Sequence, residues 1–237
     1  MSSSVVERED LERSQTKLFV LGATGGTGRA LVEQARERGH PVTAFVRSPE
    51  KLGPPRDGVT VLRGDPRNVD ELRAALPAHD AVLSALGPPG LGPTTLVSDC
   101  ARSTVTAMQA TGVRRLLVVG VAVLFENDGI LNAIGRRTFL RNVARDSADM
   151  ERIVSASGLD WTIARPPRLT NGSLTRAYGV ADGRMPPTAR FTISRADVAD
   201  FLLDELEHPS HVRRIVGVAS VKAAARRASS TTYTRSG

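Results

Sequence analysis

One glycine-rich segment constrains this chain more than any other feature. The run GATGGTG places glycine at residues 22, 25 and 28, directly after a short apolar stretch and before a helical pattern. A strand, a turn with this glycine spacing and a helix open a βαβ unit, since the first glycine permits the tight turn and the last lets the helix pack on the sheet. The segment therefore predicts an α/β fold built on a parallel sheet.

The rest of the chain repeats this alternation. Strands are predicted at residues 17–21, 42–46, 60–62, 81–86, 115–119, 161–164, 191–193 and about 215–218. Helices are predicted at residues 27–38, 69–76, 95–110, 144–157 and 195–207, with Asn68 and Ser194 as N-caps. Strands that are apolar at successive positions are typical of a sheet covered on both faces. We expect a single doubly wound Rossmann-type α/β domain, with a mostly parallel sheet and helices on both faces.

The domain is predicted to span residues 16–221, between a mobile N-terminal tail (1–15) and a mobile basic C-terminal tail (222–237). The tail supplies more than half of the net charge of +7, through Lys222, Arg226, Arg227 and Arg235. Since only 4% of the residues are aromatic, nucleic acid is not an expected partner. The oligomeric state is left open.

Composition also suggests a compartment. No apolar run is long enough to cross a bilayer, and the N-terminus lacks a signal-peptide core, so we expect a cytoplasmic protein without a membrane partner. Cys100 is the only cysteine and lies in an apolar helical pattern, which favours a buried small side chain over a reactive thiol.

The glycine turn also predicts a ligand. Backbone N–H groups at a helix N-terminus bind anions, and in this setting the anion is the pyrophosphate of a dinucleotide. The predicted cofactor-binding residues of the turn are Gly22, Thr24, Gly25, Gly26, Thr27 and Gly28.

The end of the second strand selects between dinucleotides. An NAD-binding protein usually carries Asp or Glu there to bind the ribose 2′-hydroxyl, whereas this chain carries Arg47 and Ser48. A guanidinium and a hydroxyl suit a 2′-phosphate, so we expect NADP(H) as cofactor. The alternative is that Arg47 is an ordinary surface arginine.

Two later strand ends add further candidates. Asp65 follows the third strand, where it would bind the adenine amino group, although a turn or capping role is an open alternative. Leu86 and Gly87 end the fourth strand and would pass beside the cofactor, because ligands bind at the carboxyl ends of parallel strands.

Several motifs together resemble the atypical short-chain dehydrogenase/reductases, in the NAD(P)H-binding branch that includes the NADPH-dependent flavin reductases (biliverdin-IXβ reductase) and NmrA-like proteins. Besides the glycine turn and Arg47, the resemblance rests on residues 86–87, 93–95, 112–113, 158–161, 165–168 and 193–199. It implies a Rossmann fold, with Pro166 and Pro167 bordering the nicotinamide and Arg168 at the substrate.

The chain departs from ordinary short-chain dehydrogenases in its proton-transfer residues. Those enzymes use a Tyr four residues before a Lys, and neither Tyr178 nor Tyr233 has that Lys. The serine usually found after the fifth strand is also absent. We therefore expect hydride transfer to a small conjugated acceptor, such as a flavin, quinone or tetrapyrrole, which can take its proton from water.

Arg168 is the predicted catalytic residue, holding an anionic acceptor or stabilising charge that develops on it; a structural ion pair is the alternative. The rival to a reductase is a non-catalytic NADP(H) sensor of the NmrA-like type.

Other ionisable residues are expected to be structural. Asp146, Asp149 and Glu151 share one predicted helix and suggest a solvated face. The four histidines occur in loop-like contexts typical of surface or capping roles, and their spacing predicts no metal site.

Overall fold

A computed structural model describes residues 15–125 and 140–221. The predicted tails lie outside the described residues, apart from residue 15. Within the described part, no helix is both long enough and apolar enough to cross a membrane.

Helices and strands alternate along almost the whole chain. The helices are α2 (Gly26–Glu37), α3 (Val69–Ala75), α4 (Leu96–Thr111), α6 (Arg141–Ser155) and α7 (Arg195–Glu207), with the 3₁₀ turns η1 (Pro49–Leu52) and η2 (Ala122–Leu124). The strands are β1 (Leu18–Leu21), β2 (Val42–Val46), β3 (Val59–Arg63), β4 (Ala81–Ser84), β5 (Arg115–Val119), β6 (Asp160–Arg165), β7 (Arg168–Thr170), β8 (Tyr178–Asp182), β9 (Thr192–Ser194) and β10 (Arg214–Ser220).

The main sheet has eight strands in the order β3-β2-β1-β4-β5-β6-β10-β8. All neighbouring pairs are parallel except β10 and β8, which form an antiparallel edge. The strand order reverses beside β1, since β1 pairs with both β2 and β4. In doubly wound sheets this switch point is where ligands bind, at the carboxyl ends of the strands. The predicted fold class is confirmed.

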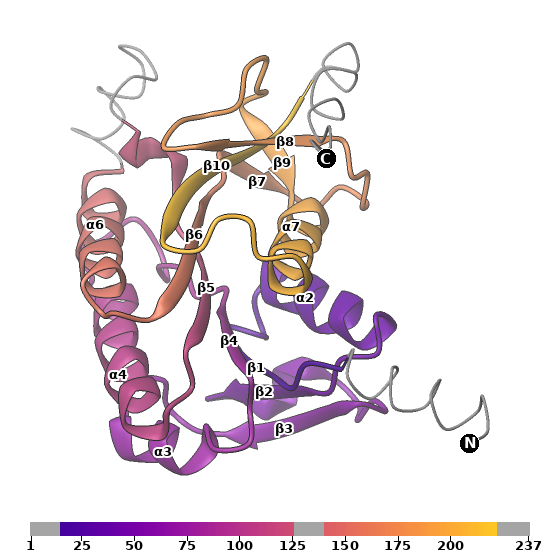
Figure 1. Ribbon diagram of the computed structural model, residues 1–237, viewed down its shortest axis with the longest axis vertical. Coiled ribbons are helices and arrows are strands. Elements are labelled where there is room, and N and C mark those ends of the chain that lie inside the picture. The colour runs from indigo at the N-terminus through magenta and orange to yellow at the C-terminus, as the bar shows by residue number, and fades with distance from the viewer. Residues whose placement is uncertain (1–14, 126–139, 222–237) are drawn as a thin grey trace, which may run out of the picture.

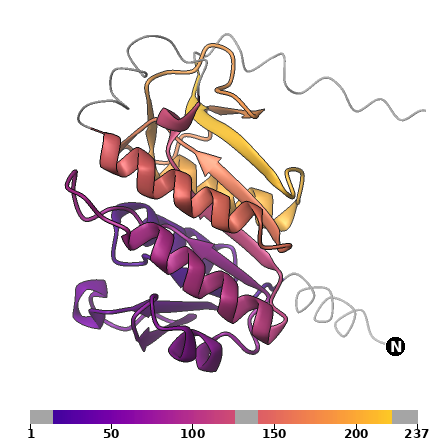
Figure 2. The same cartoon turned by 90° about the vertical axis from the view of Figure 1, so that its left-hand side faces the viewer.

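Helices cover both faces of the sheet (Figure 1). Leu31 and Val32 of α2 and Leu202 of α7 are buried against one face. On the other face, α4 and α6 lie side by side, with α3 below them in Figure 2, and Met108 and Met150 are buried there. Both cores are built from side chains that alternate along the same strands, so burial of both faces explains why the central strands β1 and β4 are apolar at nearly every position. The edge strand β3 is half-buried or exposed.

Side chains satisfy backbone donors at three helix N-termini. Asn68 accepts hydrogen bonds from the backbone N–H groups of Asp70 and Glu71, and Ser194 accepts one from Asp197, which confirms both predicted N-caps. Helix α4 is capped from another helix: the buried Asp146 of α6 accepts from the backbone N–H groups of residues 97 and 98 at 3.0 and 2.9 Å.

One strand assignment was wrong. Residues 191–193 were expected to extend the main layers, but β9 pairs with β7 in a separate two-stranded parallel sheet. The place beside β6 is taken by β10, whose Val216 and Val218 are fully buried. Phe191 is consequently outside the core, with 83% of its surface exposed. The apolar pattern predicts neither β7 nor β8, because β7 has only three residues and β8 is a half-buried edge strand.

Candidate cofactor and substrate site

The glycine turn joins β1 to α2 through backbone contacts that exclude side chains. Gly22 has a φ of +78°, and its carbonyl oxygen accepts a hydrogen bond from the Gly25 N–H at 3.0 Å. A Cβ atom on Gly22 would lie 2.7 Å from the Ala85 carbonyl, and one on Gly28 would lie 2.1 Å from the Gly22 oxygen. Glycine is therefore required at both positions, as expected from the sequence.

The N-terminus of α2 is open to an anion. Gly25 is the N-cap, no side chain bonds the first helical N–H groups, and the first turn contains no acidic residue. Gly25 and Gly26 are exposed and Thr24 is half-buried, whereas Thr27 is buried beneath them. Bare N–H groups and the positive end of the helix dipole together suit a pyrophosphate, so the residues present fit a dinucleotide.

Arg29 stiffens this turn and was not predicted. Its guanidinium donates to the carbonyl oxygens of Thr24, at 3.0 Å, and Lys51, at 2.5 Å. These bonds join the glycine turn to the segment that follows β2. No sequence pattern marks this role, because the contact with Lys51 depends on the paired strands β1 and β2.

Arg47 and Ser48 lie directly after β2, as predicted. Arg47 is exposed and forms no hydrogen bond or ion pair with any described residue. Ser48 is half-buried and precedes η1, accepting a backbone hydrogen bond from Lys51. The guanidinium of Arg47 is therefore available to a ligand.

Asp65 makes contacts within the turn that follows β3. It forms an ion pair with Arg67 at 2.6 Å and also accepts from the Arg67 backbone N–H. The hydrogen bond from Arg67 lowers the pKa of the Asp65 carboxyl, and the positive charge of Arg47 acts in the same direction. The backbone N–H of Asp65 in turn donates to Glu71 at 2.8 Å.

The end of β4 passes beside the turn. The Ala85 N–H donates to the Leu21 carbonyl at 2.9 Å, which keeps residues 85–87 close to Gly22. Leu86 packs on the core beneath α4, and Gly87 is exposed with open space around it.

An apolar pocket opens where β5 and β6 end, at the same edge of the sheet as the glycine turn. Its volume is about 720 Å³. Residues after both strands, from the start of α6 and from the segment before β9 line it: Val121, Ala122, Val123, Leu140, Val143, Pro166, Pro167, Arg168, Met185, Ala189, Arg190 and Phe191. The predicted Pro166, Pro167 and Arg168 therefore share one pocket wall.

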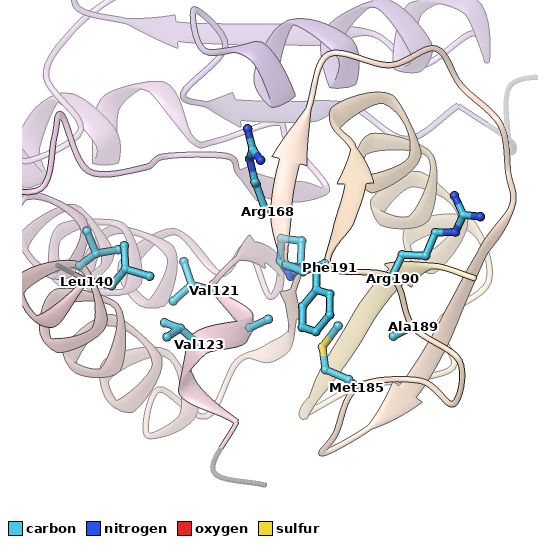
Figure 3. Close-up of a pocket in the computed structure, with 12 residues that line it drawn as sticks. Val121, Val123, Leu140, Arg168, Met185, Ala189, Arg190 and Phe191 are labelled. Carbon is cyan, nitrogen blue, oxygen red and sulfur yellow. The ribbon is translucent and has the colours of Figure 1, made fainter. Parts of the chain in front are cut away.

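Figure 3 shows how the pocket is arranged. Val121, Val123 and Leu140 face Phe191 and Met185 from the opposite side. Arg168 is exposed, points away from these two side chains, and forms no side-chain hydrogen bond or ion pair with a described residue. Sequence reasoning missed Met185 and Phe191. Phe191 is brought to the pocket by the pairing of β9 with β7, whereas Met185 follows β8 and lies close to Gly217 of β10.

A largely buried ion pair lies next to the pocket wall, since Arg165 directly precedes Pro166. Arg165, the last residue of β6, donates to the two carboxylate oxygens of Glu151 at 3.0 and 2.5 Å, and its guanidinium lies 4.6 Å from the centre of the Phe125 ring. The solvated face expected for Asp146, Asp149 and Glu151 is wrong for two of them, which are 2% and 5% exposed. Only Asp149 is outward, paired with Arg152.

The contacts of Tyr178 are structural rather than catalytic. Its hydroxyl donates to the buried Asp200 at 3.0 Å, and burial together with the charges of Asp200 and Asp204 raises its pKa well above the usual range. Among the described residues that line the pocket, the ionisable side chains are Arg168 and Arg190.

The remaining candidates have structural positions. His40 is only 3% exposed and bonds Glu207 at 3.0 Å, so of the surface or capping roles expected for the histidines, the surface position is wrong for His40. Burial raises the pKa of the Cys100 thiol to about 11, in agreement with an unreactive buried side chain. Among residues 15–125 and 140–221, no three His, Cys, Asp or Glu side chains cluster closely enough to hold a metal ion.

Comparison with known proteins agrees with this geometry. The model of a family described as NAD(P)H-binding matches residues 22–209, from the first glycine of the turn to just after α7. The chain belongs to this family. A similar protein, the UPF0659 protein YMR090W of Saccharomyces cerevisiae, is 31% identical over 214 residues, and the match covers 83% of this chain and 89% of the yeast protein.

Two further similar proteins have names that refer to reduction. A (4-alkanoyl-5-oxo-2,5-dihydrofuran-3-yl)methyl phosphate reductase of Streptomyces griseus is 29% identical over 163 residues. The match covers 69% of this chain and 51% of the reductase. A solved structure from Streptococcus pneumoniae, provisionally named an NADH-flavin reductase, superposes with a TM-score of 0.71 and is 27% identical. That match covers 86% of this chain and 99% of the other.

Proposed function

We propose that this protein is an NADPH-dependent reductase that transfers hydride to a small conjugated acceptor. The observation that carries the proposal is the apolar pocket of about 720 Å³ beside Pro166 and Pro167, at the sheet edge that holds the glycine turn. Its volume suits a small molecule, and its walls are mainly apolar. The reductase names of two similar proteins support the same reaction class.

Each part of the chain has a separate task in this proposal. The turn from Gly22 to Gly28 holds the pyrophosphate, Arg47 and Ser48 hold the 2′-phosphate, and residues 86–87 pass beside the pyrophosphate and ribose. Asp65 would contact the adenine from the turn that Arg67 stabilises. Pro166 and Pro167 border the nicotinamide, which supplies the hydride when bound.

The acceptor is proposed from what the pocket offers. Its described lining supplies no Tyr, His, Asp or Glu as a proton donor. An electron-poor conjugated system, such as a flavin, a quinone or a linear tetrapyrrole, can accept hydride and take its proton from water, so orientation in the apolar pocket supplies much of the catalysis. Arg168 would bind an anionic group of the acceptor or stabilise negative charge as it develops.

Replacing Arg168 with alanine is expected to weaken catalysis with the acceptor while leaving the affinity for NADPH unchanged. Loss of one charged hydrogen bond corresponds to roughly a tenfold to hundredfold decrease in kcat/KM for the acceptor. Steady-state kinetics with varied acceptor, and titration with NADPH, measure the two effects. Unchanged kinetics would remove Arg168 from the mechanism.

Replacing Arg47 with alanine is expected to reduce the preference for NADP(H) over NAD(H). The Arg47 guanidinium is exposed and bonds no described residue, so the substitution breaks no contact within the described protein. The affinity for NADPH should fall about tenfold or more, and the affinity for NADH should change little. Calorimetric titration of wild type and variant with both cofactors measures it. Equal losses for the two cofactors would contradict a 2′-phosphate contact.

The second candidate function is a non-catalytic NADP(H) sensor, favoured by the absence of a proton donor in the described pocket lining. Mixing the protein with NADPH and a panel of flavins and quinones separates the two functions. A reductase should oxidise NADPH only when an acceptor is present, which is followed as a loss of the reduced nicotinamide's absorbance. Tight NADPH binding without turnover of any acceptor would favour the sensor.

A further inference from the structure

Arg195 lies on the glycine turn, although it is far from the turn in sequence. It is the first residue of α7, and a Cβ atom built on Gly26 would lie 2.5 Å from its Cδ and 2.8 Å from its Nε. Gly26 is the first residue of α2, so the Arg195 side chain lies against the N-terminal turn of that helix, which is still exposed at Gly25 and Gly26. Any side chain at residue 26 would displace it.

The charge of Arg195 is not neutralised by any described carboxylate. Its guanidinium donates to the amide oxygen of Asn171 at 2.6 Å, which is a neutral partner. The helix end beneath it carries partial positive charge and no acidic residue in its first turn. Two positive groups therefore face one another, an unfavourable arrangement that an anion between them would reverse.

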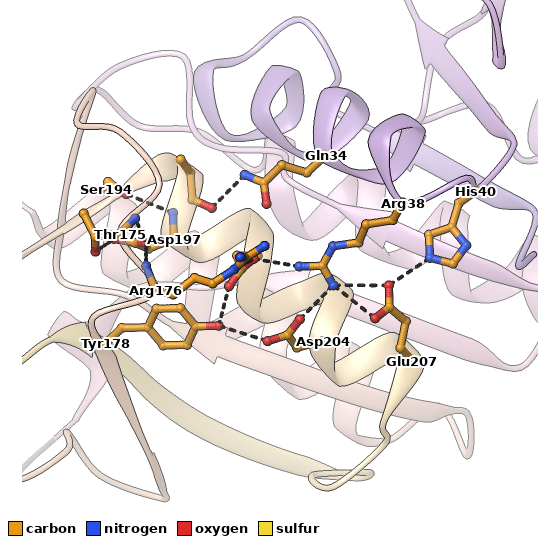
Figure 4. A network of polar contacts seen from close by, with 12 residues as sticks. Gln34, Arg38, His40, Thr175, Arg176, Tyr178, Ser194, Asp197, Asp204 and Glu207 are labelled. Atoms are coloured by element: carbon orange, nitrogen blue, oxygen red, sulfur yellow. Dashed lines mark hydrogen bonds and ion pairs between the residues drawn. The ribbon is translucent and has the colours of Figure 1, made fainter. Parts of the chain in front are cut away.

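The opposite end of the same helix pair shows the contrast (Figure 4). Arg38, just after α2, forms ion pairs with Asp200, Asp204 and Glu207 of α7 at 2.7, 2.7 and 3.1 Å. A cation at a helix C-terminus is favourable, and here three carboxylates also compensate it. The missing compensation is thus specific to the end of α2 that carries the glycine turn.

The spacing between α2 and α7 is set independently of Arg195. Besides the Arg38 ion pairs, Gln34 of α2 donates to the Ala196 carbonyl of α7 at 2.9 Å. The backbone of Arg195 is therefore held beside the turn whether or not its side chain has a partner. Loss of that side chain should leave the helix packing intact.

We propose that Arg195 is a further cofactor-binding residue, whose guanidinium binds the pyrophosphate of the dinucleotide together with the N–H groups of α2. Asn171 is its positioning residue. Asn171 directly follows β7, the strand that begins with Arg168, so this contact also connects the cofactor site to the pocket wall. The inference rests on the cofactor part of the proposed function and is independent of which acceptor is reduced.

Calorimetric titration of Arg195→Ala with NADP⁺ and with NAD⁺ tests this assignment. Both cofactors carry the pyrophosphate, so both affinities should fall by about the same factor, roughly tenfold to hundredfold. Arg47→Ala, in contrast, should weaken NADP⁺ alone. Arg195→Lys should recover part of the affinity, and the deficit of Arg195→Ala should shrink as salt screens the charge.

Arg73→Ala is the matched control, since it removes an exposed arginine of α3 whose ion-pair partner among the described residues is Asp70 alone, at 3.8 Å. It should bind both cofactors as the wild type does. Asn171→Ala should cause a loss smaller than that of Arg195→Ala. Unchanged affinity of Arg195→Ala would overturn the inference while leaving the reductase proposal intact. A loss that accompanies a lowered melting temperature and is not relieved by Arg195→Lys would also overturn it.

Discussion

Replacing Gly28 with alanine is expected to abolish most of the dinucleotide affinity. The new Cβ atom would lie 2.1 Å from the Gly22 carbonyl oxygen and 2.8 Å from the Ala23 Cα. Both are backbone atoms, so neither clash can be relieved by rotating a side chain. The turn must therefore shift away from the helix, which misaligns the N–H groups that we propose bind the pyrophosphate. Loss of one or two charge-assisted hydrogen bonds corresponds to about a hundredfold weaker binding.

The same substitution should destabilise the fold, because overpacking against backbone costs about 1–3 kcal/mol or more. Thermal unfolding and calorimetric titration measure the two effects. Gly90→Ala is the matched control, since a Cβ atom there meets nothing within 4 Å and should leave both quantities unchanged. A Gly28→Ala protein with wild-type affinity and melting temperature would contradict the role assigned to the turn.

Replacing Glu151 with alanine should produce the largest loss of stability among the substitutions considered. The side chains of Glu151 and Arg165 are 6% and 13% exposed, so the substitution leaves a buried guanidinium without its carboxylate. Breaking a buried ion pair in this way costs about 3–5 kcal/mol. For a chain of this size the melting temperature should fall by roughly 10 °C.

Two control variants separate the buried charge from other effects. Asp149→Ala removes a carboxylate from the same helix, but its partner Arg152 is 74% exposed, so the cost should be below about 1 kcal/mol. The double variant Glu151→Leu/Arg165→Met removes both charges and should regain much of the lost stability. If the double variant were as unstable as Glu151→Ala, loss of packing rather than an unpaired charge would explain the result.

Locally determined features could be predicted from the sequence. The requirement for glycine at residue 22 follows from a positive φ, and the N-caps at Asn68 and Ser194 bond N–H groups two or three residues away. The strands of the parallel sheet were predictable because burial on both faces demands consecutive apolar residues. The position of Arg47 at the carboxyl end of β2 could be predicted for the same reason, since Arg47 directly follows such a strand.

The burial of the carboxylates of α6 could not be predicted from the sequence in this way. Asp146, Asp149 and Glu151 carry the same charge on one helix, yet one caps α4, one faces outward and one pairs with Arg165 of β6. A charged residue predicts an exposed side chain unless a partner is buried with it, and that partner lies in another element. The helical pattern alone cannot reveal it.

The sequence by itself determined the strand and helix alternation, the glycine turn and the cation after β2, because each depends on residues close together along the chain. Only the tertiary structure decided the rest of the proposed site. Pairing of β9 with β7 brings Phe191 to the pocket, and packing of α7 beside α2 lays Arg195 on Gly26. These contacts join segments that are far apart in sequence, so no local pattern records them.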